Sequence, residues 1–394
     1  MELKHAKEQE KSSHKTFLSC NWRQLFQVSM EFVRSQIFCF YTKVDFNSAV
    51  LGVPINIKYA FNGELKETYI QSIEAYLELL SVNSFMEGHR LTIWRKPFTH
   101  LLPIYLCGSH WSKARSVFEG VIKDIARQPE HYTPVLAAEI ICKIMNTMVV
   151  SVMNQTLHLS LQYLQGYVYF YRILLQLVVE DSSLQELIER KIGEFVEEPL
   201  SRDKWNVPAL GEWLPLLTVS LKYSWHDVAP AYLTENFDRN AKWILKEAPH
   251  LRYNLYSTDI DWERIKTSFH ATKVSNKLLM FHVYFLKTFA KPPNMRRTEI
   301  IDAYDSFYNQ ISHEQQQIFL DEVNKIKNLQ TWSEFFLYID YPEFASPATL
   351  SQLLKDSIIR SQNKEYHQPR PRNNQPRNRP GKPKNKLSLA EFII

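Results

Sequence analysis

The chain has 394 residues, of which 45% are hydrophobic and 13% aromatic, so it can bury a core without a metal or a disulfide bond. It has nine glycines, about 2% of the chain against a typical usage of roughly 7%. Because hairpin turns and phosphate-binding loops depend on glycine, this shortage argues against all-β and Rossmann-like folds and favours helices.

The formal net charge of +5 is distributed unevenly along the chain. Residues 361–386 hold eight Lys or Arg residues and one acid, so the rest of the chain is close to neutral. The first 15 residues are charged and include acids, which argues against a secretion signal and a mitochondrial transit peptide. We therefore expect a cytoplasmic or nuclear protein with four free, widely spaced thiols, Cys20, Cys39, Cys107 and Cys142.

The first predicted element is a strand at 53–61, where Ile55, Ile57 and Tyr59 alternate with polar residues. Residues 64–85 are predicted to form a helix, because apolar side chains recur there at intervals of three and four. A single strand does not make a sheet. At most one short strand or hairpin is therefore expected near 53–61.

Helical periodicity covers most of the remaining body. Thr133-Pro134 and the spacing of Ser224 and Asp227 are typical of helix starts. The segment 157–179 approaches the length of a membrane span, but it carries His158, Gln162, Gln165, Arg172 and Gln176, so we expect a buried helix and no transmembrane segment. The expected helices lie at 111–126, 134–153, 157–179, 182–196, 227–245 and 261–290, with shorter helices up to about residue 361.

These patterns predict an all-α protein, an irregular multi-helix array or bundle, followed by a disordered basic C-terminal tail. No repeat of about 34 or about 40 residues recurs, so a regular solenoid is not expected. The predicted regions are an N-terminal helical region at 1–200, a tryptophan-rich C-terminal helical region at 201–360, the tail at 361–386, and a short apolar motif at 387–394. The boundary between the two helical regions is placed in the Arg202–Pro208 stretch.

The tryptophan-rich region has five tryptophans between Trp205 and Trp262, and we expect most of this aromatic density to lie in the core. An interface is the alternative, because Trp, Tyr and Arg dominate binding hot spots. Arg239 is the candidate partner-binding residue of this region.

The common catalytic motifs are absent from the sequence. No two glycines lie within ten residues of each other, which excludes the phosphate loop, the dinucleotide turn and the nucleophile elbow. Neither C-x-x-C nor H-E-x-x-H occurs, so no catalytic residue, metal or cofactor is predicted. Asp259, Asp261 and Glu263 could ligate a divalent cation, but we interpret them as acids at a helix start. His282, in an apolar helix, is expected to be a hydrogen-bonded core histidine.

The tail from Pro369 to Lys386 has five prolines and no apolar side chain, so it cannot build a core. An extended polyproline II chain would hold its basic side chains apart as separate phosphate contacts. A solubilising linker or an import signal are the alternatives. The residues expected to bind RNA or another polyanion are Arg370, Arg372, Arg377, Arg379, Lys382, Lys384 and Lys386.

The last eight residues are mainly apolar, apart from Ser388 and Glu391, and end in Phe392, Ile393 and Ile394. We expect these three residues either to bind the groove of a partner or to fold back on the body.

The sequence as a whole indicates a non-catalytic helical interaction or adaptor protein. Its helical scaffold would bind a protein partner, and its tail would add attraction to RNA. The alternative is an enzyme, or an accessory domain of one, with a site assembled from separate helices. The oligomeric state stays open.

Overall fold

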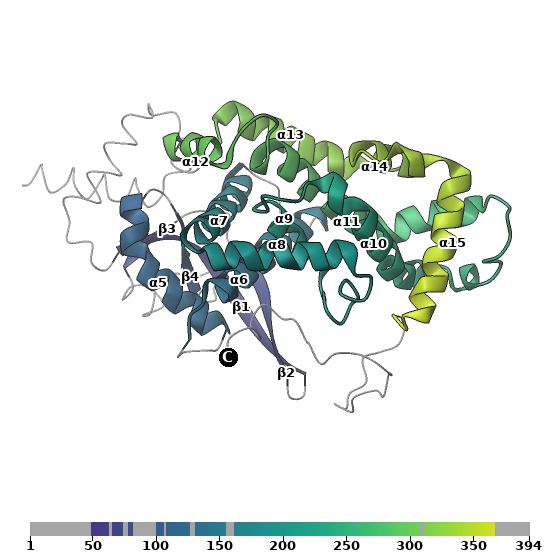
Figure 1. Ribbon diagram of the computed structural model, residues 1–394, viewed down its shortest axis with the longest axis horizontal. Helices are drawn as coiled ribbons and strands as arrows, with labels where there is room; N and C mark the ends of the chain where they lie inside the picture. The colour runs from purple at the N-terminus through teal and green to yellow at the C-terminus, as the bar shows by residue number, and fades with distance from the viewer. Residues whose placement is uncertain are drawn as a thin grey trace, which may run out of the picture.

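The computed structural model describes residues 49–62, 65–73, 78–81, 100–105, 108–126, 131–154, 161–307 and 311–366 (Figure 1). Most of these residues are helical, which confirms the all-α class. The helices are α5 (Gly108–Ala126), α6 (Pro134–Met153), α7 (Leu161–Glu180), α8 (Ser182–Glu197), α9 (Leu210–Leu217), α10 (Trp225–Glu247), α11 (Trp262–Phe285), α12 (Arg297–Ser306), α13 (His313–Asn328), α14 (Trp332–Tyr338) and α15 (Pro347–Asn363). Short helical turns lie at Pro249–Arg252, Leu286–Ala290 and Pro342–Ala345.

The predicted strand at 53–61 lies within a longer strand, β1 (Ala49–Asn62). It pairs antiparallel with β2 (Leu65–Ile73), β3 (Glu78–Ser81) and β4 (His100–Pro103). The sheet is thus larger than the single strand or hairpin expected from the sequence. Helices α5 and α6 contact it at the edge of the body (Figure 1).

The helix predicted at 64–85 is wrong, because β2 and β3 occupy that segment. A spacing of four residues keeps side chains on one face of a helix, and it also keeps them on one face of a strand. The run Thr68-Tyr69-Ile70 consists of β-branched and aromatic residues, which favour strands. This composition was the signal that the periodicity outweighed.

One close contact explains a glycine in β1. A Cβ added at Gly52 would lie 2.7 Å from the carbonyl oxygen of Leu102 in β4. Glycine therefore allows the backbones of β1 and β4 to approach each other.

Several predicted helix starts are confirmed. The Thr133 side chain accepts a hydrogen bond from the Leu136 amide at 3.1 Å, at the start of α6. The backbone amide of Ser224 donates to the Asp227 carboxylate at 2.7 Å, at the start of α10. These caps satisfy amides that have no partner inside the helix.

One hydrophobic cluster extends from Val53 to Leu354 and crosses the stretch Arg202–Pro208, where the boundary between the two helical regions was placed. Helix α7 carries most of the segment expected to be buried, and its apolar residues from Tyr163 to Val178 lie in this cluster. Among the described helices, α6 has the length and apolar composition of a membrane span, but it also lies in the cluster. A core helix meets the same criteria, so α6 gives only weak support for a span.

The start of the tail differs from the prediction. Helix α15 continues to Asn363, and Tyr366 is buried, so residues 361–366 belong to the body rather than to the tail. The proposed disorder of the tail concerns residues that lie outside the described part of the chain.

Candidate functional site

The end of the body where α10 gives way to α11 carries large exposed aromatic side chains. The exposed fractions are 49% for Trp243, 65% for Tyr253, 87% for Tyr256 and 63% for Trp262. We call these four residues the aromatic surface. Large exposed aromatic side chains in close succession are typical of interaction surfaces, because their burial in a complex removes much apolar area from water.

Ion pairs connect the α10 side of this surface with the α11 side. Glu247 lies 3.9 Å from the His270 ring, and Glu263 lies 2.9 Å from the His250 ring. One residue of each pair lies within four positions of a tryptophan, Glu247 after Trp243 and Glu263 after Trp262. The last turn of α10 and the turn that follows it therefore lie beside α11, and the intervening loop connects the two helices at the α15 end of the body (Figure 1).

The loop between α10 and α11 is fixed by two cations. The Arg264 guanidinium is buried and donates to the carbonyl oxygens of Leu251 and Tyr253, at 2.6 and 3.2 Å. Lys355 of α15 donates at 2.7 Å to two further loop carbonyls, those of Ser257 and Asp259. Because these bonds hold the backbone, the exposure of the tyrosines is a property of an ordered loop.

The aromatic surface lies among positive charges. The ammonium groups of Lys242 and Lys246 lie 5.5 and 5.6 Å from the centre of the Trp243 ring, within cation–π range. The exposed basic residues of the region are Lys242, Lys246, Arg252, Lys266 and Lys273, and the exposed acids are Glu247, Asp259 and Glu263. The local excess of positive charge favours a partner that presents acids beside apolar groups.

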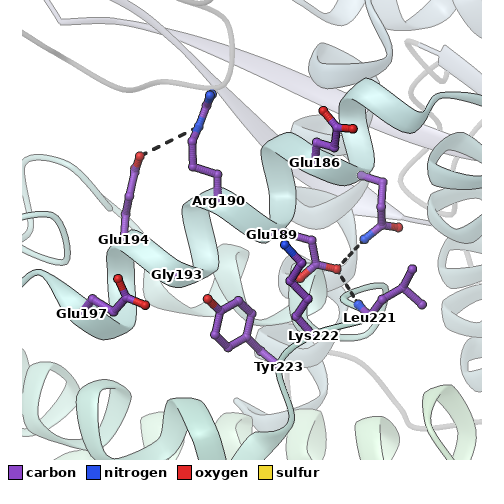
Figure 2. A pocket seen from close by; sticks show the side chains of 10 residues that line it. Glu186, Glu189, Arg190, Gly193, Glu194, Glu197, Leu221, Lys222 and Tyr223 are labelled. Carbon is purple, nitrogen blue, oxygen red and sulfur yellow. Dashed lines mark hydrogen bonds and ion pairs between the residues drawn. The ribbon is translucent and has the colours of Figure 1, made fainter.

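A concave feature, which we call the α8 groove, lies between α8 and the turn that precedes α10 (Figure 2). Its volume is about 410 Å³. It is lined by Gln185, Glu186, Glu189, Arg190, Gly193, Glu194, Glu197, Leu221, Lys222 and Tyr223. The lining thus includes four carboxylates and two basic groups.

The floor of the α8 groove is organised by Glu189. This buried carboxylate accepts hydrogen bonds from the Gln185 side chain at 2.6 Å, the Ser220 hydroxyl at 2.7 Å and the Leu221 amide. These three hydrogen bonds connect the carboxylate to α8 and to the turn before α10, so Glu189 positions the turn. Its role is therefore structural.

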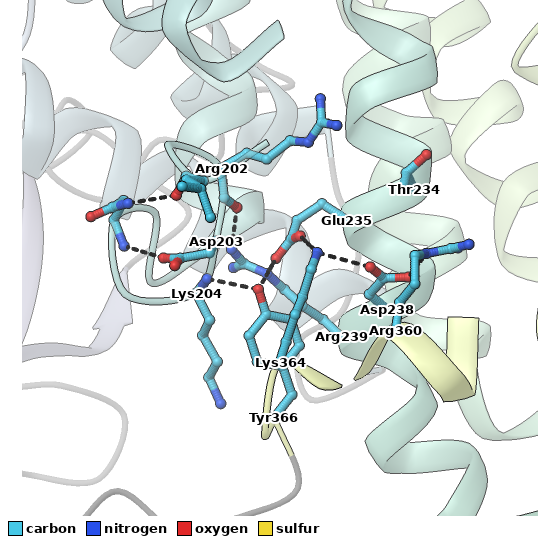
Figure 3. A network of polar contacts seen from close by, with 12 residues as sticks. Arg202, Asp203, Lys204, Thr234, Glu235, Asp238, Arg239, Arg360, Lys364 and Tyr366 are labelled. Atoms are coloured by element: carbon cyan, nitrogen blue, oxygen red, sulfur yellow. Dashed lines mark hydrogen bonds and ion pairs between the residues drawn. The ribbon is translucent and has the colours of Figure 1, made fainter. Parts of the chain in front are cut away.

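The root of the tail is attached to the body through two buried carboxylates (Figure 3). Glu235 accepts from the Tyr366 hydroxyl and from the Lys364 ammonium, both at 2.6 Å. Asp238 accepts from Lys364 and from Arg360, both at 2.8 Å. Burial raises the pKa of Asp238 above its ordinary value, and the two cations oppose that rise. We call these five residues the carboxylate network.

Arg239, the residue singled out from the sequence, lies against this network. Its guanidinium pairs with Glu235 at 2.7 Å and donates to the backbone oxygens of Arg202 and Pro208, at 3.0 and 3.4 Å. These contacts give it a structural role. Its contribution to partner binding stays a prediction.

The other predicted binding residues lie outside the described part of the chain. They are Arg370, Arg372, Arg377, Arg379, Lys382, Lys384, Lys386, Phe392, Ile393 and Ile394. Their binding to a polyanion or a partner stays a prediction.

The described residues give no support to metal chemistry, because they contain no group of three or more His, Cys, Asp or Glu side chains that could hold an ion. Asp261 caps α11 and accepts from the Arg264 amide at 2.8 Å, so the acids at this helix start have a structural explanation. His282 is buried and shares a hydrogen bond of 3.1 Å with the Tyr167 hydroxyl, as expected. Burial lowers the pKa of His282 to about 3, which keeps the ring neutral.

The aromatic surface was missed by sequence reasoning, which expected most of the five tryptophans to be buried. Trp213 and Trp225 are buried, but Trp205, Trp243 and Trp262 are exposed. The available signal was local charge, because Lys242 precedes Trp243, and Asp261 and Glu263 flank Trp262. Charged neighbours in adjacent positions are typical of a solvated helix end.

No protein-family model and no curated protein matches this chain.

Proposed function

We propose that this chain is a non-catalytic helical adaptor of the cytoplasm or nucleus. Its body binds a protein partner through the aromatic surface, and its tail from Arg370 to Lys386 binds RNA or another polyanion. The observation that carries the proposal is the exposure of Trp243, Tyr253, Tyr256 and Trp262 around a loop whose backbone is hydrogen-bonded in place.

Two physical arguments support the protein-binding half. Burial of a large apolar side chain contributes about 1.5–3 kcal/mol, so two or three of these rings would supply a hot spot. The loop carbonyls are already bonded to Arg264 and Lys355, so little backbone entropy is lost when a partner binds.

The protein-binding half is tested by quantitative affinity purification with the full-length chain. The double variant Tyr256→Ala, Trp262→Ala should lose most of the bound partner, because it removes two exposed rings without opening the core. The matched control is Trp205→Ala, another exposed tryptophan that lies outside the aromatic surface. Equal recovery of all partners by the wild-type chain and the double variant would refute this half.

The polyanion-binding half is tested by RNA crosslinking across a salt series. The variant carries Gln at Arg370, Arg372, Arg377 and Arg379. Each lost phosphate contact should reduce the salt slope by roughly 1, so binding at low salt should fall steeply. A truncation should end after Tyr366, since Lys364 and Tyr366 belong to the carboxylate network. Unchanged crosslinking of the variant would refute the proposal that the tail binds RNA or another polyanion.

A further inference from the structure

The α8 groove has negative charge that the body leaves unneutralised. Within the described part of the chain, Glu186 and Glu197 make no ion pair or hydrogen bond, and both are exposed. Glu194 has a weak pairing with Arg190 at 3.9 Å. Lys222 is the remaining cation of the lining. The groove therefore presents carboxylates to a positively charged occupant.

The α8 groove also contains an aromatic ring. The Tyr223 side chain lies against α8 beside Gly193, as Figure 2 shows. A Cβ added at Gly193 would lie 2.7 Å from the Tyr223 hydroxyl oxygen, so this close approach depends on the glycine. An aromatic ring bordered by carboxylates suits a chain that alternates proline with basic residues, because proline rings pack on aromatic faces while the cations pair with the acids.

The basic tail begins close to the C-terminal end of α8. Tyr366, the last described residue, accepts through its hydroxyl oxygen from the Lys204 amide at 3.0 Å. Arg202, two positions before Lys204, donates to the carbonyl oxygens of Phe195 and Val196 in the last turn of α8, at 3.4 and 3.2 Å. The first residues of the tail are thus attached beside the helix that forms one wall of the groove.

We propose that the α8 groove binds the proline- and arginine-rich segment 369–386 of the chain's own tail. That segment carries seven basic residues and no acid. An extended polyproline II chain of this length spans about 55 Å at about 3.1 Å per residue, whereas α8 from 186 to 197 spans about 17 Å. The tail reaches the whole groove with residues to spare.

Tethering makes weak docking sufficient. A short flexible linker gives an effective concentration of about millimolar. A tethered segment with millimolar affinity is therefore bound about half of the time. The attraction is electrostatic at an exposed site, and salt therefore weakens it. The docking does not require RNA, but RNA would compete for the same arginines.

The test is limited trypsin proteolysis of the nuclease-treated full-length chain, with the rate of cleavage after Arg372 and Arg377 followed by mass spectrometry. The groove variant is Glu186→Gln, Glu194→Gln, Glu197→Gln. The control variant, Glu314→Gln, Asp321→Asn, Glu343→Gln, removes three exposed acids from α13 and the Pro342–Ala345 turn. At low salt the groove variant should be cleaved about twofold faster than the wild-type and control chains, because a segment that is bound about half of the time is already free for the other half. At about 0.5 M salt the three rates should converge.

Equal cleavage rates in all three chains at low salt would overturn the proposal, whether the tail is free or protected elsewhere. Protection that increases with protein concentration would assign the groove to the tail of a second copy, which also overturns docking within one chain. Loss of RNA binding leaves this readout unchanged, so failure of the polyanion proposal and failure of the docking proposal can be told apart.

Discussion

The two ends of α10 reverse the usual distribution of charge and apolar surface. The first part of the helix, taken from Trp225 through its middle turns to Asp238, buries Trp225 together with two carboxylates, Glu235 and Asp238, which are fully inaccessible. The last part exposes Trp243 to solvent between two lysines. A buried charge is tolerated where several donors compensate it, and an exposed tryptophan is tolerated at a modest cost in stability.

The difference indicates separate roles for the two ends. The carboxylate network joins α10 to α15 and to the root of the tail, so its charges act on the architecture. The four rings of the aromatic surface are each about half exposed or more, so they remain available to a partner. Substitutions at the first end should therefore change stability, and substitutions at the second end should change binding.

The largest expected effect is that of Trp225→Ala. The Trp225 indole is buried, packs on Tyr232, and donates to the Ile339 carbonyl oxygen at 2.7 Å. Its loss leaves a cavity and an unpaired carbonyl, so the free energy of unfolding should fall by about 4 kcal/mol. Urea denaturation followed by circular dichroism measures this change. A loss below about 1 kcal/mol would show that the first part of α10 is not a core element.

Asp238→Ala should destabilise the chain by about 3 kcal/mol, because Arg360 and Lys364 lose the carboxylate that compensates their partial burial. The matched control is Glu247→Ala, on the same helix. Glu247 is exposed and lies 3.9 Å from its histidine partner, so its removal should cost less than about 0.5 kcal/mol. Similar losses for the two variants would remove the contrast between the buried and the exposed end.

His282 is a buried titratable side chain, so its protonation should make the stability of the chain depend on pH. Burial lowers its pKa from 6.5 to about 3, so the unfolded chain takes up the proton first as the pH falls. Above pH 6.5 the ring is neutral in both states, and the free energy of unfolding is not reduced by this group. As the pH falls from 6.5 towards 3, protonation of the unfolded chain progressively lowers the free energy of unfolding. Between pH 7 and pH 5 the wild-type chain should lose about 2 kcal/mol more than His282→Gln. Parallel pH profiles in urea denaturation would contradict this assignment.

The elements that sequence reasoning predicted well depend on local contacts. The caps at Thr133 and Ser224 involve partners three residues away, and the helices that follow them were predicted from the same few residues. The segment 65–73 was assigned wrongly because its pairing with β1 is a tertiary contact that its own periodicity does not specify.

The features that sequence reasoning missed depend on distant contacts. Asp238 finds its cations 122 and 126 residues further along the chain, and no local pattern around Asp238 indicates them. Arg239 was selected for its residue type, but its donors contact Arg202 and Pro208, which lie more than 30 residues earlier in the chain. Tryptophan density predicted burial, whereas the exposure of Trp243 and Trp262 follows from where α10 ends and α11 begins.

Apart from the Glu247→Ala control, the smallest expected effect on stability is that of Trp243→Ala, although this residue has the same type and lies on the same helix as Trp225. The Trp243 ring is half exposed, and its lysine contacts contribute about 0.5–1 kcal/mol at such a site. The free energy of unfolding should therefore fall by less than about 1 kcal/mol, while recovery of the protein partner falls several-fold. Denaturation and affinity purification on the same preparation measure both quantities. A destabilisation above about 2 kcal/mol would show that Trp243 belongs to the core and would remove the distinction between the two ends of α10. Unchanged stability together with unchanged partner recovery would show that the exposed ring has no role in binding.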